Sequence, residues 1–539
     1  MSELSSFTFS FDGEINAIRV ESDSPSIFAS LIDVFTVENP AYFYLEKKGI
    51  RFADETFSAI TPLGTFQTGM FPVVYVAALK IVGNDKSRIH ISDADKAIIQ
   101  KKCFPLKGLF DDTYEVGEIN PKFPYRWFQK DGVEALMRHG RGICISPTAS
   151  GKSLMIAALV NEIRKAGFPE MGERKHILLI VPTRQLVDQM AGDFDEYGIG
   201  DYSTYTSNSG SKRAGTFRDN SCNEGFNNLI ITNHSWITDK YRDKRFPLKK
   251  IGCLIADEVH TVKSGTQILK LVKRVDATLK FGLTATQSKF VFDRWVNYGE
   301  FGITVFQTDI KQLQDEGFLT KLEIRNIYGM IKDIDPHLPF SLSRTRAKLN
   351  DVLSDGTVVD VGTAYKMELE FIEANCERLW MPVFDEIGKS FDFSKNNMVV
   401  LFDRISIGKT LQKALSERMD GVDVHYIDGT VDISIREGIR SRLEEGVGNI
   451  LLAQTVTASV GLNIKNLHGI VFAFSGRSYI RTIQSIGRVL RQNRNKTVAK
   501  LYEVWYNLKY SSKHHDEKMD ILTDSYGGDC IKDTIKLAI

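Results

Sequence analysis

The sequence predicts an α/β protein with two parallel-sheet domains, a small N-terminal α/β domain and a helical insertion. Short, continuous apolar runs alternate with helical segments, which is typical of parallel strands that are buried on both faces. The runs fall into two groups, separated by a charged and mostly helical stretch. The first group is HILLIVP, LIIT, CLIADE and FGLTAT (within 176–286), and the second is MVVLFD, VHYIDG, NILLAQ, GIVFAF and KLYEVW (within 398–505).

The length supports this division, because 539 residues are too many for a single hydrophobic core. Near the N-terminus, Phe7, Phe9 and Phe11 alternate with polar residues and predict a half-buried strand. We expect an N-terminal accessory domain (1–115), a first sheet domain (116–325), a second sheet domain (326–510) with the helical insertion near 335–390, and a C-terminal tail (511–539).

The composition is that of an ordinary globular protein, with 42% hydrophobic and 25% charged residues. The sequence has no apolar run of about 18 residues, so we expect no membrane-spanning helix. Its N-terminus lacks the pattern of a signal peptide. The six cysteines include no C-x-x-C pair, which predicts neither a zinc site nor a disulfide framework. These features favour a cytoplasmic protein.

The stretch SPTASGKS (146–153) lies between an apolar run and an amphipathic segment, which predicts a strand–loop–helix unit. Glycine at 151 lets backbone N–H groups turn toward a phosphate, Lys152 carries the matching charge, and the Ser153 hydroxyl suits Mg²⁺. The strict phosphate-loop pattern has glycine where Ser146 stands, so a polar strand-to-helix turn is the alternative. The nucleotide contacts expected here are Thr148, Ala149, Ser150, Gly151, Lys152 and Ser153.

The run CLIADE ends in two carboxylates, Asp257 and Glu258. A carboxylate at the end of a buried parallel strand, beside the strand that precedes a phosphate loop, is where Mg²⁺ is held, and a second carboxylate can accept a proton from water. An acidic strand end without function is the alternative. We therefore expect Ser153 and Asp257 at the metal, and Glu258 as the base.

With these two motifs in order, the chain resembles the superfamily 2 helicases over about residues 120–500. PYRWFQKDGVEAL (124–136) carries the family's Arg-x-x-Gln signature at Arg126 and Gln129, where the glutamine reads adenine and Tyr125 or Phe123 stacks on the base. VPTRQLVDQM (181–190), TNHSW (232–236) and Thr284-Ala285-Thr286 resemble further motifs of the first domain. The last of these couples hydrolysis to movement in the family. The resemblance implies two tandem RecA-like domains with ATP and Mg²⁺ as cofactors.

The second domain carries the remaining motifs of this resemblance. LFDRISIGKTL, TVTASVGLN (with Gly461 as a nucleotide contact) and QSIGRVLR (484–491) match motifs IV, V and VI. Gln484, Arg488 and Arg491 fall on one helical face at i, i+4 and i+7. The family uses these positions at the γ-phosphate, where the arginines stabilise transition-state charge.

Nucleic-acid contacts are expected at loops that follow strands and in a basic stretch, RSYIRTIQSIGRVLRQNRNK (477–496), which contains no acidic residue. The stretch AYFYLEKKGIRF (41–52) interleaves aromatic and basic residues, which suits nucleic acid, although a half-buried strand with a charged turn explains it as well. The candidate strand-contacting residues are Arg184, Thr232, Asn233, Arg404, Lys409 and Thr457.

Within the superfamily, the sequence resembles the phage UvsW-type branch-migration helicases, through PTASGKS, QSIGRVLR and the NIKNLH segment after motif V. This implies an ATP-dependent DNA helicase or translocase that remodels forks, junctions and R-loops, with single-stranded and branched DNA as partners, in the host cytoplasm if a phage encodes it. Asn463 departs from the family, where an aspartate touches the ribose. An RNA-directed helicase and a restriction-type duplex translocase stay open as alternatives.

Overall fold

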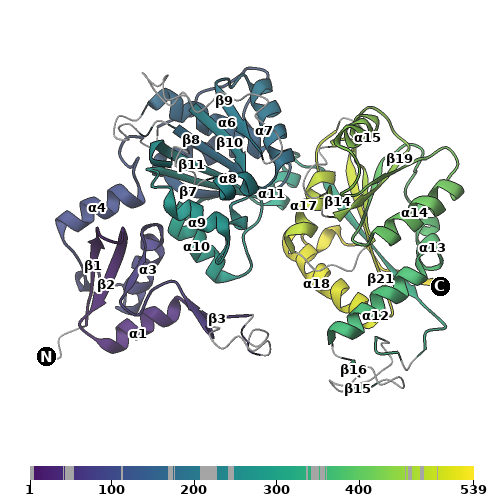
Figure 1. Ribbon diagram of the computed structural model, residues 1–539, viewed down its shortest axis with the longest axis horizontal. Coiled ribbons are helices and arrows are strands. Elements are labelled where there is room, and N and C mark those ends of the chain that lie inside the picture. The colour runs from purple at the N-terminus through teal and green to yellow at the C-terminus, as the bar shows by residue number, and fades with distance from the viewer. Residues whose placement is uncertain are drawn as a thin grey trace. The chain divides into compact units, whose positions relative to one another are not determined.

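The computed structural model describes residues 5–40, 42, 46, 54–110, 113–167, 174, 176–206, 228–240, 248–335, 338–340, 351–352, 358–359, 361–455, 457–458, 464–473, 479–493 and 496–539. The chain divides into two compact units (Figure 1). The first contains Met1–Ser146 and Gly151–Thr308, and the second contains Asp309–Ile539 together with Pro147–Ser150.

The N-terminal region of the first unit is a four-stranded sheet in the order β5-β2-β1-β6. Its central strand β1 pairs antiparallel with β2 and parallel with β6. Phe7 and Phe9 of β1 are fully buried, as their alternation predicts, whereas Phe11 is half-buried. The elements are β1 (Phe7–Asp12), β2 (Ala17–Ser22), α1 (Pro25–Val34), β3 (Thr36–Glu38), β4 (Thr56–Ser58), β5 (Thr65–Gln67), α3 (Phe71–Ile81), β6 (Ile89–Ile91) and α4 (Asp93–Cys103).

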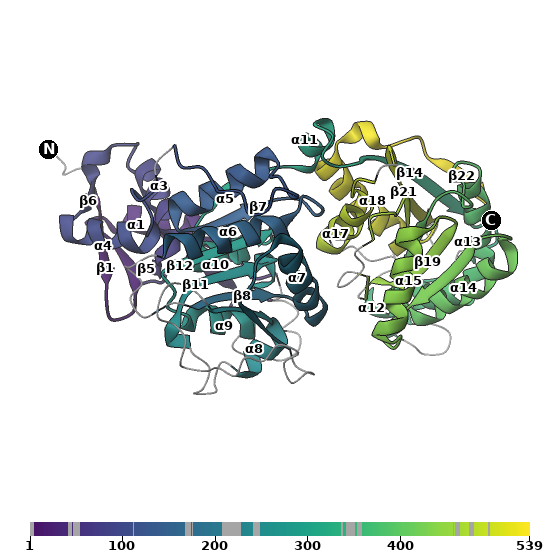
Figure 2. The ribbon, with the colours of Figure 1, turned by 90° about the horizontal axis from the view of Figure 1, so that it is seen from above.

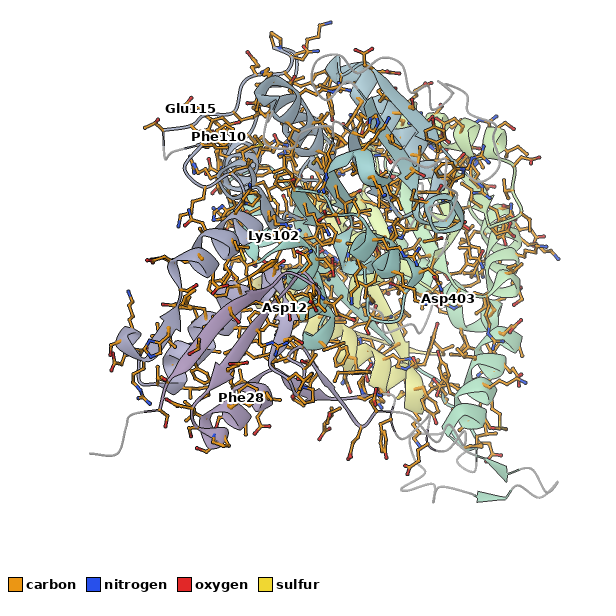
Figure 3. All side chains as sticks on the ribbon, turned by 60° about the vertical axis from the view of Figure 1, so that its left-hand side comes forward. Asp12, Phe28, Lys102, Phe110, Glu115 and Asp403 are labelled. Atoms are coloured by element: carbon orange, nitrogen blue, oxygen red, sulfur yellow. The ribbon has the colours of Figure 1, made fainter. Side chains whose placement is uncertain are left out.

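This N-terminal region packs directly on α10 (Val291–Phe301) of the same unit. The ring of Phe57 stacks on that of Phe292 at 5.0 Å between centroids, and Phe35 meets Trp295 at 5.4 Å. Gly69 lies so close to α10 that a Cβ there would come within 2.1 Å of the Tyr298 carbonyl oxygen. The interface is therefore aromatic and tightly fitted. Figure 3 shows Phe28 and Asp12 on this N-terminal region.

The first unit also contains a seven-stranded parallel sheet in the order β13-β7-β12-β11-β8-β10-β9. One apolar cluster packs α5, α6 and α7 on one face, and a second packs α8, α9 and α10 on the other (Figure 2). The strands are β7 (Arg141–Ile145), β8 (His176–Val181), β9 (Tyr202–Tyr205), β10 (Asn228–Asn233), β11 (Ile251–Asp257), β12 (Leu279–Thr284) and β13 (Thr304–Gln307). The remaining helices are α5 (Trp127–His139), α6 (Lys152–Ala166), α7 (Arg184–Tyr197), α8 (His234–Lys240) and α9 (Gln267–Arg274).

The second unit contains another seven-stranded parallel sheet, in the order β18-β19-β17-β20-β21-β14-β22. Its strands are β14 (Lys321–Met330), β17 (Met398–Phe402), β18 (Asp423–Ile427), β19 (Asn449–Gln454), β20 (Gly469–Phe472), β21 (Val498–Tyr506) and β22 (Ile535–Ala538). Its helices are α11 (Ile310–Asp315), α12 (Val361–Ala374), α13 (Cys376–Gly388), α14 (Ile405–Arg418), α15 (Ile433–Glu445), α17 (Tyr479–Val489) and α18 (Lys509–Tyr526), and the short strands β15 (Asp351–Val352) and β16 (Val358–Val359) pair with each other.

The two parallel sheets confirm the predicted fold class. The expected division at 325/326 falls inside β14, and the compact units part between Thr308 and Asp309. Residues 511–539 supply most of α18, whose inner face is buried, and the edge strand β22. Helices α12 and α13 lie within the segment 335–390, where an insertion is expected. Among the described residues, no helix combines the length and the apolar character needed to cross a membrane.

Candidate active site

The phosphate-loop candidate links the fully buried strand β7 to helix α6. Two of its residues have left-handed backbones, Ala149 (φ 71°) and Gly151 (φ 85°). A Cβ at position 151 would also lie 2.4 Å from Nε2 of Gln129. Both observations favour glycine at this position, because other residues disfavour this backbone region and a Cβ would displace the glutamine amide. The Lys152 Nζ donates to the carbonyl oxygen of Ser146 at 3.4 Å.

The Arg-x-x-Gln signature supports this loop from α5. The backbone N–H of Arg126 donates to the Oε1 of Gln129 at 2.9 Å, and Gln129 is only 4% exposed. That bond fixes the orientation of the amide and turns Nε2 toward Gly151. The hydroxyl of Tyr125 donates to the carbonyl oxygen of Gly117 at 3.2 Å, so the ring packs at the edge of the apolar core.

The structure places an aromatic residue beside the loop that sequence reasoning missed. The hydroxyl of Tyr197, at the end of α7, lies 3.4 Å from the Oγ of Ser153. The ring of Phe123 meets Tyr197 edge-to-face at 5.1 Å. These two rings come from segments far apart in sequence, and the motif pattern gives no signal for Tyr197. Phe123 therefore packs against a ring that lies beside the loop, whereas the Tyr125 hydroxyl is bound to Gly117.

Asp257 ends the fully buried strand β11, and Glu258 follows it directly. Glu258 adopts a left-handed backbone (φ 51°), and its N–H donates to Asp257 Oδ1 at 3.0 Å. Burial and the adjacent Glu258 carboxylate raise the pKa of Asp257 to about 7. Burial alone would raise the pKa of Glu258 as well, but Lys152 and His260 outweigh it and lower that pKa to about 2. The Oε1 of Glu258 lies 3.8 Å from Lys152 Nζ, so the loop and the strand end face one another.

A buried network ties Glu258 to the next strand. Oγ1 of Thr284 lies 3.1 Å from Glu258 Oε2 and 2.8 Å from His260 Nδ1, and His260 Nδ1 lies 3.2 Å from the same Glu258 oxygen. Thr284 also contacts the carbonyl oxygen and the N–H of Thr286, at 2.8 and 3.2 Å. The sequence flags these residues as separate motifs, whereas the structure joins them into one network behind the carboxylate.

The donors near the loop fit Mg²⁺. Ser153 offers a hydroxyl and Asp257 a carboxylate, which are the hard oxygen ligands this ion takes in small number beside phosphate oxygens. Asp257 is buried next to the carboxylate of Glu258, so a cation bound there would balance negative charge of these two groups. Among the described residues, no group of three or more His, Cys, Asp and Glu could form an all-protein metal cage.

The motif VI arginines belong to the second unit. Arg488 lies near the end of α17 and Arg491 just beyond it, where Thr320 N–H and Oγ1 donate to the carbonyl oxygens of Leu490 and Arg491 at 2.9 and 3.2 Å. Lys496 Nζ closes the same end of the helix by donating to the Val489 carbonyl oxygen at 2.8 Å. The side chain of Gln484 and all of Gly461 lie outside the described residues.

The predicted strand-contacting residues lie where the two sheets end. Arg184 is the first residue of α7 and Asn233 the last of β10, while Thr232 is fully buried, with its hydroxyl donating to the Tyr205 carbonyl oxygen at 3.0 Å. In the second unit, Arg404 caps α14 and pairs with Glu373. Lys409 is exposed on the same helix, and Thr457 is half-buried after β19. Most of the aromatic and basic stretch at 41–52 falls outside the described residues.

Comparison with known proteins agrees with this geometry. The family described as "Type III restriction enzyme, res subunit" matches residues 122–289, and "Helicase conserved C-terminal domain" matches residues 384–493. The chain belongs to the superfamily 2 helicases. It is an enzyme that couples ATP hydrolysis to nucleic-acid unwinding or translocation.

Two viral relatives resemble this helicase, and the first of them matches more of the chain than the motor occupies. The "ATP-dependent DNA helicase uvsW" of Enterobacteria phage T4 is 27% identical over 503 residues, covering 91% of this chain and 89% of the relative. "Putative helicase 22" of a Sulfolobus islandicus filamentous virus is 24% identical over 411 residues, which is 72% of this chain and 65% of the relative.

Among solved structures, the fold resembles the ATP-dependent Type ISP restriction-modification enzyme LlaBIII, with a TM-score of 0.56, 13% identity, and coverage of 77% of this chain and 31% of that chain. It also resembles a fragment of a putative HsdR subunit of a type I restriction enzyme from Vibrio vulnificus, with a TM-score of 0.53, 15% identity, and coverage of 77% and 70%. These likenesses show the fold of the motor.

Proposed function

We propose that this helicase acts on DNA and remodels branched forms such as forks, junctions and R-loops. The ATP chemistry is supported by one observation above others: Lys152 and Glu258 face each other across 3.8 Å, from a phosphate loop and a neighbouring strand end. The choice of DNA is supported by a relative that bears the name of a DNA helicase and matches 91% of this chain, more than the motor alone occupies.

In the proposed cycle, Lys152 and the backbone of residues 148–151 hold the β- and γ-phosphates of ATP, while Gln129 reads the adenine. Ser153 and Asp257 would hold Mg²⁺, which neutralises phosphate charge when it is bound. Glu258 orients the attacking water and accepts its proton, and Thr284 and His260 keep that carboxylate in place. The second unit supplies Gln484, Arg488 and Arg491 for the γ-phosphate, so hydrolysis follows domain closure.

The motor alone has no means of recognising a junction, because its contacts go to the backbone of one strand. We assign that role to the N-terminal domain. Its aromatic interface with α10 supports a rigid attachment, which would hold any second DNA contact at a fixed distance from the motor. Removing the whole domain would uncover Phe290, Phe292 and Trp295, so a deletion would perturb the motor fold itself.

Charge removal is the sharper test of this role. The triple substitution Lys47→Ala, Lys48→Ala and Arg51→Ala changes only the basic stretch of this domain. We expect ATPase stimulation by single-stranded DNA to persist, while preference for a fork over linear duplex of equal length falls at fixed salt. An unchanged fork preference would remove this stretch from junction recognition.

The nucleic acid is identified by ATPase assays with single-stranded DNA, linear duplex, forked DNA and RNA side by side. Lys152→Ala is the negative control, since its loss removes the cation that holds the phosphates and should abolish hydrolysis without unfolding the chain. The largest stimulation is expected with forked DNA. Greater stimulation by RNA than by any DNA would refute the assignment.

A duplex translocase that does not separate strands is the second candidate. The match of residues 122–289 to a restriction-enzyme subunit family favours it. Displacement of a triplex-forming strand from linear duplex, without release of single strands from a fork, would identify this activity instead.

A further inference from the structure

A pocket in the second unit opens at the carboxyl ends of two neighbouring strands, β17 and β20. The chain leaves β17 through α14 toward β18 and leaves β20 through α17 toward β21, so the two connections diverge on opposite sides of the strand pair. Such a switch point is where open parallel sheets bind ligands. Asp403, Arg404, Phe472 and Ala473 form this edge of the pocket.

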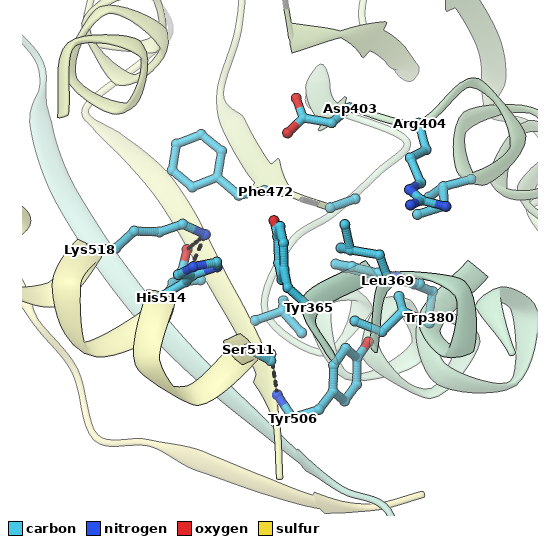
Figure 4. Close-up of a pocket in the computed structure, with 15 residues that line it drawn as sticks. Tyr365, Leu369, Trp380, Asp403, Arg404, Phe472, Tyr506, Ser511, His514 and Lys518 are labelled. Atoms are coloured by element: carbon cyan, nitrogen blue, oxygen red, sulfur yellow. Dashed lines mark hydrogen bonds and ion pairs between the residues drawn. The ribbon is translucent and has the colours of Figure 1, made fainter. Parts of the chain in front are cut away.

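The walls are apolar and aromatic. Tyr365 and Leu369 of α12, Trp380 of α13 and Ile407 of α14 line this pocket. Figure 4 shows Tyr365 in the middle of the view, with Phe472 on one side and Leu369 and Trp380 on the other. Tyr365 is half-buried, whereas Trp380 and Phe472 are only 3% and 1% exposed, so Tyr365 is the ring against which a planar ligand would stack.

Polar groups are present inside this apolar setting. Lys518 Nζ pairs with Glu503 at 3.1 and 3.4 Å, although the two side chains are only 2% and 1% exposed. The same ammonium lies 5.5 Å from the centre of the Phe472 ring. A buried ion pair costs more in desolvation than an apolar pair would, so its retention calls for a reason beyond stability.

Trp380 adds an unused donor. It is 3% exposed, and its Nε1 has no hydrogen-bond acceptor within the part of the chain that the structure describes. A buried donor left without an acceptor is destabilising, and an incoming acceptor would recover that cost. The lining thus combines apolar and aromatic groups with one donor that lacks an acceptor among the described residues, Trp380 Nε1, which suits an acceptor atom on the edge of a nucleobase.

The mouth carries little net positive charge. Arg404 pairs with Glu373, and Asp403 lies beside it. A phosphate would therefore gain little electrostatic attraction at the mouth, whereas the binding of a neutral planar ring does not depend on that charge. This balance distinguishes the pocket from a backbone-binding groove.

We propose that this pocket receives one unstacked nucleobase from the strand bound along the edge of the second sheet. This inference rests on the proposed nucleic-acid motor function and adds a base contact to it. Stacking on an aromatic side chain strengthens binding by about tenfold or more per base. Because the contact is to the base, this share of the affinity changes little with salt.

The test compares binding of a single-stranded oligonucleotide with that of an abasic strand of equal length, at two salt concentrations. Leu369→Trp fills the pocket, and Tyr365→Leu removes a ring while keeping apolar bulk. Glu370→Trp is the matched control, since this exposed neighbour on the same helix does not line the pocket. Both pocket variants should bind the base-bearing strand about tenfold more weakly and the abasic strand as the wild type does.

Each outcome decides the inference. It is supported if the loss is confined to the base-bearing strand and persists at high salt, with the control unaffected. It is overturned if both pocket variants bind that strand as the wild type does, or if both strands weaken equally. If no nucleic acid stimulates the wild-type ATPase, the proposed function fails and this inference with it. Stimulation without base dependence refutes the pocket alone.

Discussion

Replacing Thr284 by valine tests whether the network behind Glu258 supports hydrolysis. Thr284 is fully buried, and valine reproduces its shape without the hydroxyl. The substitution removes contacts of 2.8 Å to His260, 3.1 Å to Glu258, and 2.8 and 3.2 Å to the carbonyl oxygen and N–H of Thr286. The hydroxyl has one hydrogen, which it donates either to Glu258 or to the Thr286 carbonyl oxygen, while its oxygen accepts the Thr286 N–H. Valine therefore leaves one acceptor and one donor without this partner.

Each such buried group costs about 1–3 kcal/mol, so we expect a loss of about 3 kcal/mol in the free energy of unfolding of the first unit. That corresponds to a fall of roughly 5 °C or more in its melting temperature. Hydrolysis should fall about tenfold, since Glu258 loses a donor that orients it and helps to keep it ionised.

The assay measures DNA-stimulated ATP turnover and thermal unfolding for Thr284→Val beside Thr284→Ser. Serine retains the hydroxyl and loses only a methyl group, so it should keep most of the activity and lose about 1 kcal/mol. If valine and serine show equal turnover and equal melting temperatures, the hydroxyl is not what connects the two strands, and the reasoning is refuted.

Three further predictions concern other groups. Glu258→Gln should retain ATP binding while turnover falls by about 10²-fold or more, because an amide cannot accept the proton; near-normal turnover would remove Glu258 from that role. Arg491→Ala should lower turnover on the order of 10³-fold with little change in ATP affinity, and an equal loss of affinity would make it a ground-state ligand instead. Burial, with Lys496 nearby, lowers the pKa of His468 to about 4, and its Nδ1 accepts the Asn397 N–H at 3.2 Å. The unfolded chain therefore binds more protons between the unfolded pKa of about 6.5 and pH 4, so this contribution to stability is present above pH 6.5 and is lost as the pH falls through 4. The stability difference between wild type and His468→Asn should shrink by roughly 2–3 kcal/mol from pH 7 to pH 4 in urea unfolding, and a constant difference would contradict the assignment.

The sequence by itself determined the two parallel sheets and the local geometry of the phosphate loop. Strands such as His176–Val181 are buried on both faces, and that burial favours a continuous apolar run, which the sequence displays directly from Ile177 to Val181. The left-handed backbone at Gly151 can also be predicted from the sequence, because a left-handed turn before a helix is a local property of the backbone. Residues near one another in sequence control both features.

Only the tertiary structure decided which distant residues meet. Nothing in the amino-acid sequence indicates that Tyr197 lies beside Ser153, Thr284 against His260, or Phe57 on Phe292. A hydroxyl or a ring in the sequence has no stated partner, since that partner depends on how helices and strands pack. The same reason applies to residues 511–539, which we expect from the sequence to be a tail. In the structure, α18 places Lys518 against Glu503 of β21. The hydrophobic pattern of a sequence indicates which segments are buried, whereas packing alone decides which residue each buried side chain contacts.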